Sequence, residues 1–154
     1  MDKNFEKMVE KLQESIIEDA KKIYSQKTIE YFIQPKNLGR MNDPDATAVV
    51  KGSCGDTMEF YLLLKDERIS EILFFTDGCG PTIACGSVVT EIAKGKSIKK
   101  ALKISPADVI DKLGGLPEEN IHCAILAVIT LHQTIADYLL KKQLTSPDSK
   151  FDLS

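Results

Sequence analysis

Hydrophobic residues near the N-terminus recur at steps of three and four, which predicts an amphipathic helix over about residues 4–23. The apolar stripe of this helix consists of Phe5, Val9, Leu12, Ile16, Ala20 and Ile23. We expect the stripe to pack on the chain's own domain, and a homodimer or partner contact is the alternative. A second helix is predicted over residues 26–33, because the position before Pro35 disfavours the α region.

Three segments in the middle of the chain have the pattern of β-strands. Residues 46–52 are rich in Thr and Val, residues 57–65 have apolar side chains at every second position, and residues 69–76 are largely apolar. Asp66 and Glu67 separate the last two segments and suit a tight hairpin turn. The pattern therefore predicts a small antiparallel sheet of three strands.

The rest of the chain is predicted to be helical, which makes the fold class α+β. A helix begins near Pro81 and ends before Gly95, and two short amphipathic segments flank Pro106. A longer helix is expected over about residues 122–142. The helix that begins near Pro81 is expected to bury Ile83, Val88 and Ile92. The last helix is expected to bury Leu126, Ile129, Ile135 and Leu139.

A chain of 154 residues with 43% apolar content is expected to form one domain with a hydrophobic core. We place this domain at residues 1–144, including the N-terminal helix, and expect residues 145–154 to be a flexible tail. The net charge of −3 and the pI near 5.4 give no reason to expect nucleic acid or an anionic membrane as a partner.

The same composition bears on where the protein works. No apolar run approaches the ~18–20 residues of a membrane span. The many acidic residues of the first helix are unlike an export signal or transit peptide. We therefore expect a cytoplasmic protein, in which four cysteines point to metal or sulfur chemistry rather than to disulfides.

Three of the cysteines lie in short motifs at turns or predicted helix starts. Cys54, Cys79 and Cys123 are 25 and 44 residues apart, so only folding brings them together. Asp56 and His122 add a second metal-capable side chain to two of the motifs. Three sulfurs, a carboxylate and an imidazole suit a soft metal or an iron–sulfur cluster better than acid–base catalysis.

With these motifs the chain resembles the IscU/NifU-type iron–sulfur cluster assembly scaffolds, from about Tyr24 to Lys142. The segment from Tyr24 to Gly39 is similar to the opening helix and loop of that family. Three further motifs are similar to its ligand motifs, namely Cys54-Gly55-Asp56, Gly78-Cys79-Gly80 and Ile121-His122-Cys123.

The resemblance implies a small three-stranded antiparallel sheet covered on one side by helices. It also implies a scaffold rather than an enzyme, which binds a transient 2Fe–2S cluster, iron, or zinc in the isolated protein. The implied ligands are Cys54, Asp56, Cys79, His122 and Cys123, with Asp56 and His122 both open as the fourth ligand. Cys123 would accept persulfide sulfur from a cysteine desulfurase. Apo iron–sulfur proteins would receive the cluster, and a ferredoxin is a candidate electron donor.

The chain departs from the family in three places. Glu118, Glu119 and Asn120 replace residues of the family's chaperone-binding segment, which argues against binding to a dedicated Hsp70-type chaperone. Cys85 stands where the family often has serine, and we interpret it as a packing residue. The predicted N-terminal helix precedes the region of resemblance altogether.

Other interpretations of these residues remain open. One alternative is a persulfide-accepting sulfur relay in which Cys54, Asp56, Cys79 and Cys123 hold zinc. Another is a relay that carries persulfide between Cys85 and Cys123 without assembling a cluster. His132 is interpreted as an ordinary surface or packing residue. The lysines at 94, 96, 99 and 100 are most simply a solvated surface, although an acidic acceptor such as a ferredoxin could dock there.

Overall fold

The computed structural model describes residues 2–145 and contains one three-stranded antiparallel sheet. Its strands are β1 (Ala46–Lys51), β2 (Thr57–Lys65) and β3 (Arg68–Thr76), and β2 lies in the centre. Asp66 and Glu67 close the β2–β3 hairpin with positive φ angles of 54° and 63°, as a tight two-residue turn requires. The predicted sheet and hairpin are confirmed.

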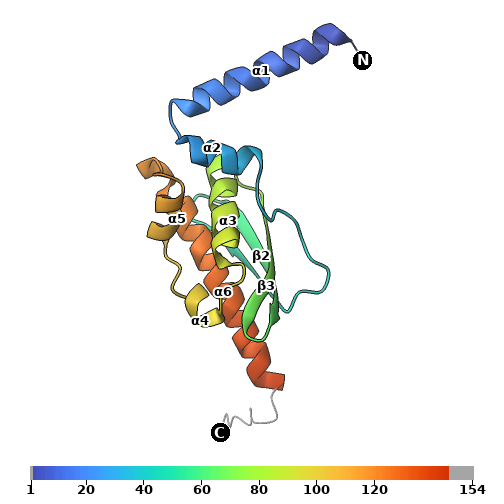
Figure 1. The fold of residues 1–154 in the computed structure, drawn as a ribbon, viewed down its shortest axis with the longest axis vertical. Coiled ribbons are helices and arrows are strands. Elements are labelled where there is room, and N and C mark those ends of the chain that lie inside the picture. Colours follow the sequence, from blue (N-terminus) through green and yellow to red (C-terminus); the bar gives the residue numbers. More distant parts are fainter. Residues whose placement is uncertain (1, 146–154) are drawn as a thin grey trace.

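Helices cover one face of this sheet, so the predicted α+β fold class is confirmed as well. Figure 1 shows α3 and α6 lying side by side next to the strands, and both helices contact the sheet. The helical elements are α1 (Lys3–Lys21), α2 (Gln26–Ile33), α3 (Gly80–Ala93), α4 (Ile98–Ala101), α5 (Pro106–Lys112), a 3₁₀ turn (Glu118–Asn120) and α6 (Ile121–Thr145).

The core lies between the helices and the sheet. Along β2, Met58, Phe60 and Leu62 are fully buried, whereas the residues between them are only partly covered. Phe74 of β3 packs beside Phe60, with ring centroids 6.3 Å apart. Since successive strand residues point to opposite faces, the alternation fixes which face of the sheet meets the helices.

The inner sides predicted for the two main helices are partly wrong. In α6, Leu126 and Ile135 are buried as expected, but Ile129 and Leu139 are 43% and 41% exposed. In α3, Val88 is buried whereas Ile83 and Ile92 are only half-buried. Most of α3 is buried because it contacts α2, α6 and β3. A single amphipathic stripe therefore does not describe it.

The first helix does not pack on the domain, which contradicts our expectation for its apolar stripe. None of the residues of α1 is buried, and Phe5, Leu12 and Ile16 are each more than half exposed. Figure 1 shows α1 extending away from the rest of the molecule beyond α2. The Asp2 side chain caps the start of the helix by accepting a hydrogen bond from the Asn4 amide. Local interactions of this kind stabilise the helix without packing on the domain.

One described segment, Glu118–Leu144, is long and apolar enough to cross a membrane by length and composition. The expectation that no segment approaches such a span is therefore wrong on those two criteria. Half of the apolar window is buried inside the domain, where α6 contacts β1, β2 and α3. We interpret the segment as a core helix. The predicted tail, residues 145–154, lies outside the described residues except for Thr145.

A polar contact joins the helices α2, α3 and α5. The Tyr31 hydroxyl of α2 donates to Glu91 Oε1 of α3 over 2.6 Å, and Lys112 of α5 lies 3.7 Å from the same oxygen. Burial and the hydrogen bond to Glu91 raise the pKa of Tyr31 to about 12, from an ordinary value near 10. Folding therefore favours the neutral phenol.

The Tyr31→Phe variant is expected to lose about 1 kcal/mol of unfolding free energy at neutral pH, the value of a half-exposed hydrogen bond to a carboxylate. Because the folded-state pKa is the higher one, the contribution of Tyr31 is complete below pH 10 and disappears as the pH rises through about 12. Urea denaturation of both proteins between pH 8 and 12 measures this difference. A gap between them that stays constant to pH 12 would contradict the assignment.

Candidate metal and sulfur site

The three predicted motifs meet at one end of the domain. Cys54 and Asp56 lie in the turn between β1 and β2, Cys79 is the N-cap of α3, and His122 and Cys123 form the first turn of α6. The charges of Cys79, Cys54 and Asp56 all act on the Cys123 thiol. The side chains predicted from sequence are therefore neighbours in the structure.

Glycines shape the two loops that carry Asp56 and Cys79. The amide of Gly52 donates to the Asp56 carbonyl over 2.7 Å, and Gly55 between them has a φ of +93°, a conformation that glycine adopts without strain. A Cβ atom at Gly78 would lie 2.7 Å from both Asp56 Oδ2 and Thr82 Cβ. Residue 78 has to be glycine for these two side chains to meet.

A short chain of hydrogen bonds runs through the centre of the site. The Thr82 hydroxyl lies 2.9 Å from Asp56 Oδ2 and 3.3 Å from Cys123 Sγ. On the other side, His122 Nε2 lies 3.6 Å from Cys123 Sγ. Asp56, Cys123 and His122 are thus brought together, with Thr82 between the carboxylate and the thiol.

The three site thiols differ in exposure. Cys54 and Cys79 are exposed, whereas Cys123 is only 1% exposed. Burial raises the pKa of the Cys123 thiol and the nearby charges raise it further, while the hydrogen bond with Thr82 lowers it. The thiol expected to accept sulfur is therefore the least accessible of the three.

Chemically, the residues at this end of the domain fit an iron–sulfur cluster or a thiophilic metal ion. Three thiols, one carboxylate and one imidazole are all ligands for iron or zinc. Within residues 2–145, no group of three or more His, Cys, Asp or Glu side chains, including Asp56, His122 and Cys123, is arranged so that it could hold a metal ion as it stands. A metal ion bound at this end of the domain would therefore need these side chains to rearrange.

Two residues near the site were given no role from the sequence. Thr82 is fully buried at the start of α3, and the only sequence signal for it is a hydroxyl within an apolar run. Tyr24 precedes α2, and the pKa of its phenol is raised by burial and then by the charges of Cys79, Glu119 and Cys123. Both side chains therefore lie at this end of the molecule.

The fourth cysteine lies behind the site in the core. Cys85 is fully buried on α3, and burial, followed by the charges of Cys123 and Cys79, raises the pKa of its thiol. This environment agrees with a packing role. His132 is half-buried on α6, and its Nε2 atom is buried without a hydrogen-bond partner among the described residues.

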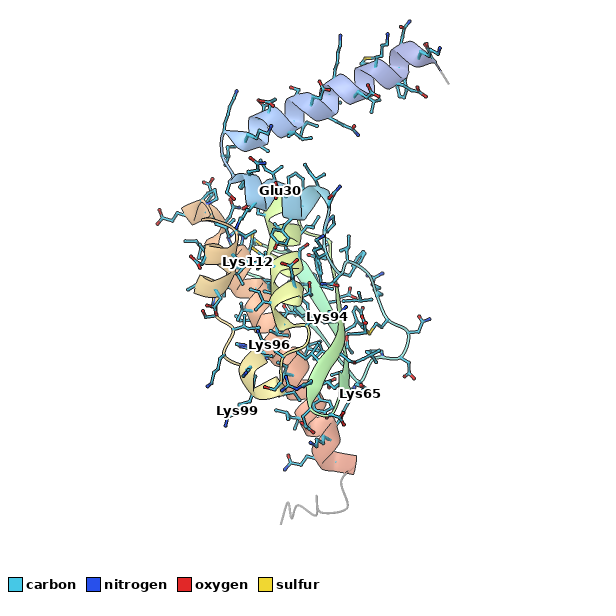
Figure 2. All side chains as sticks on the ribbon, in the orientation of Figure 1. Glu30, Lys65, Lys94, Lys96, Lys99 and Lys112 are labelled. Atoms are coloured by element: carbon cyan, nitrogen blue, oxygen red, sulfur yellow. The ribbon has the colours of Figure 1, made fainter. Side chains whose placement is uncertain are left out.

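The lysine cluster lies at the other end of α3 from the site. Cys79 is the N-cap of this 14-residue helix and Lys94 its C-cap, so the two are about 22 Å apart along the axis. Figure 2 shows Lys94, Lys96 and Lys99 gathered around α4 and the end of α3, away from α2. The lysines and the site thiols therefore lie at opposite ends of α3.

Known proteins agree with this fold and these motifs. Residues 23–145 match the model of the NifU-like N terminal domain. The chain is 44% identical over 120 residues to the iron-sulfur cluster assembly scaffold protein IscU 1 of Archaeoglobus fulgidus, covering 77% of this chain and 78% of the relative. It is 38% identical over 130 residues to the IscU scaffold protein of Aquifex aeolicus, covering 82% and 83%.

A solved structure shares the fold. It is a putative iron-sulfur cluster assembly scaffold protein for the SUF system from Fervidobacterium islandicum, with a TM-score of 0.62 and 21% identity over 73% of this chain and 96% of that one. Fold, motifs and relatives together define the IscU/NifU-type class of proteins that the sequence resembled. The chain belongs to the NifU-like N-terminal domain family, and α1 lies outside the matched region.

Proposed function

We propose that this chain is a cytoplasmic scaffold on which a 2Fe–2S cluster is assembled de novo and then transferred to apo-proteins. The main support is the meeting of Asp56, His122 and Cys123 beside two exposed thiols, in a chain whose curated relatives are named as scaffold proteins. Iron and the cluster are the cargo of this site rather than a resident cofactor.

Sulfur would arrive from a cysteine desulfurase as a persulfide. The Cys123 thiolate attacks the terminal persulfide sulfur, a new S–S bond forms on Cys123, and the desulfurase cysteine leaves as a thiolate. A donor such as a ferredoxin then reduces this sulfur to sulfide in the presence of iron. Cys54, Cys79 and Cys123 would hold the product, with Asp56 or His122 as the fourth ligand.

Anaerobic reconstitution with iron, cysteine and a desulfurase tests the proposal. Visible charge-transfer bands that fade as an apo-ferredoxin gains its cluster are the expected result. A colourless protein that retains zinc and still accepts sulfur would instead support the zinc-binding relay. The thiol and carboxylate ligands suit both metals, so the experiment has to decide between them.

The Asp56→Ala variant is expected to slow cluster transfer by about tenfold, or about 1.4 kcal/mol in the barrier. A carboxylate is a weaker ligand than a thiolate for iron in a cluster, so release would begin at Asp56. Stopped-flow absorption with apo-ferredoxin measures the rate. Asp43→Ala removes an exposed carboxylate from the loop before β1 and is the matched control. Equal transfer rates for the two variants would contradict this role.

A further inference from the structure

The hydroxyl of Thr82 has partners unlike those of the other buried threonines in the long helices. Thr90, Thr130 and Thr134 each donate to a backbone carbonyl of the preceding helical turn, which is the ordinary bond of a helical threonine. Thr82 lies in the first turn of α3, and its hydroxyl instead contacts Asp56 Oδ2 and Cys123 Sγ. Its hydroxyl therefore joins the β1–β2 turn and the starts of α3 and α6 rather than completing its own helix.

The backbone around Thr82 is arranged so that this contact forms. Gly78 lies against both Asp56 and Thr82, and any larger residue there would meet their side chains at 2.7 Å. The amide of Gly78, just before α3, donates a hydrogen bond to the Thr76 hydroxyl over 3.0 Å. These contacts bring the carboxylate from the β1–β2 turn onto the start of α3.

A hydroxyl carries one proton and two lone pairs. Thr82 therefore donates to Asp56 or to Cys123 at any one time, and it can accept from the Cys123 thiol while it donates to the carboxylate. The contact uses Oδ2 of Asp56 rather than Oδ1. Hydrogen bonds of this kind orient ligating carboxylates and thiolates toward a metal.

From these contacts we infer that Thr82 is a positioning residue, which holds the Asp56 carboxylate and the Cys123 sulfur in the arrangement that a metal ion or cluster uses. The inference rests on the proposed function, because it takes Asp56 and Cys123 as ligands. Thr82 itself touches neither iron nor sulfide. Loss of its hydroxyl leaves both side chains in place but free to rotate apart.

The test measures the affinity of the cluster-free protein for Zn²⁺ by competition with a chelator at fixed pH under reducing conditions. Thr82→Val keeps the shape and removes the hydroxyl, and it is expected to weaken zinc binding by about 10–100-fold. Thr82→Ser keeps the hydroxyl and is expected to restore affinity to within about threefold of the wild type, given the usual scatter of such contributions. Thr134→Val makes the same change in α6, eleven residues beyond Cys123, and should leave zinc affinity unchanged.

Two outcomes would overturn the inference. The first is a Thr82→Val protein that binds zinc as tightly as the wild type. The second is equal weakening by Val and Ser, because a side chain that keeps the hydroxyl would then fail to restore zinc binding. If Thr82→Val does not fold by circular dichroism, Thr82→Ala replaces it with the same expected loss. Zinc affinity does not depend on cluster assembly, so failure of wild-type reconstitution would count against the proposed function alone.

Discussion

The Cys123→Ser variant is expected to carry no persulfide after incubation with a desulfurase and cysteine, and to form no cluster above background. Serine has no sulfur to accept the transferred atom and is a poor ligand for a soft metal. Mass spectrometry under non-reducing conditions detects the added sulfur on the wild-type protein. Absorption spectra of the reconstituted sample detect the cluster.

Cys85→Ala provides the matched control for this experiment. It also removes one thiol, but from a fully buried position behind the site. Both persulfide loading and cluster assembly should stay close to the wild-type level. Loading that depends on Cys85 would instead support the relay between Cys85 and Cys123. Normal persulfide on the Cys123→Ser protein, at Cys54 or Cys79, would remove Cys123 from the acceptor role.

The Gly86→Ala variant is expected to destabilise the protein by about 1–3 kcal/mol, the usual cost of overpacking a core. An added Cβ atom would lie no more than 3.0 Å from three ring carbons of Phe74, which is itself fully buried. The ring has little freedom to move aside, because it packs on Phe60. In an exposed helix, a change from glycine to alanine would stabilise the protein by about 1 kcal/mol. At Gly86 the expected effect on stability has the opposite sign.

Thermal or urea denaturation measures this loss, and a second substitution identifies its cause. Phe74→Leu removes the ring atoms that the new methyl group would meet. Adding Gly86→Ala to the Phe74→Leu protein should therefore cost less than adding it to the wild type, since contacting residues show non-additive effects. Equal costs in the two backgrounds would show that the clash with Phe74 is not the reason.

The sheet could be predicted from the sequence because its signals are local. Alternation along β2 and the Asp66-Glu67 turn each depend on neighbouring residues alone, and both are present in the structure. The buried sides of the helices were harder to predict, because the burial of a helix residue depends on how many elements surround the helix. The exposed positions of Ile129 and Leu139, and the two-sided burial of α3, are set by tertiary contacts that periodicity does not encode.

The apolar stripe of α1 also shows that periodicity does not predict packing. Its spacing predicts a helix correctly, but the helix makes no buried contact with the domain. An amphipathic pattern reports that a helix has an apolar face, whereas the surface that covers this face is a property of the fold or of a partner. The pattern alone therefore gave the element and not its packing.

At the site, the motifs predicted which side chains would meet but not how they are held. Metal-capable residue types and the family resemblance pointed to Asp56, His122 and Cys123, and the structure brings these together. Thr82 follows no such pattern, because a single hydroxyl in an apolar run is common. Its role emerges only where a turn, a helix start and a second helix approach one another.

The length of α6 also sets a fixed distance between the site and the far end of the helix. Cys123 lies in its first turn and Thr145 at its end, so about 33 Å of uninterrupted helix separates the two. A fluorescent label near residue 145 would stand outside quenching contact with a bound cluster yet within energy-transfer range of it. Cluster loading and release could then be followed by emission in real time, without labelling any residue of the site.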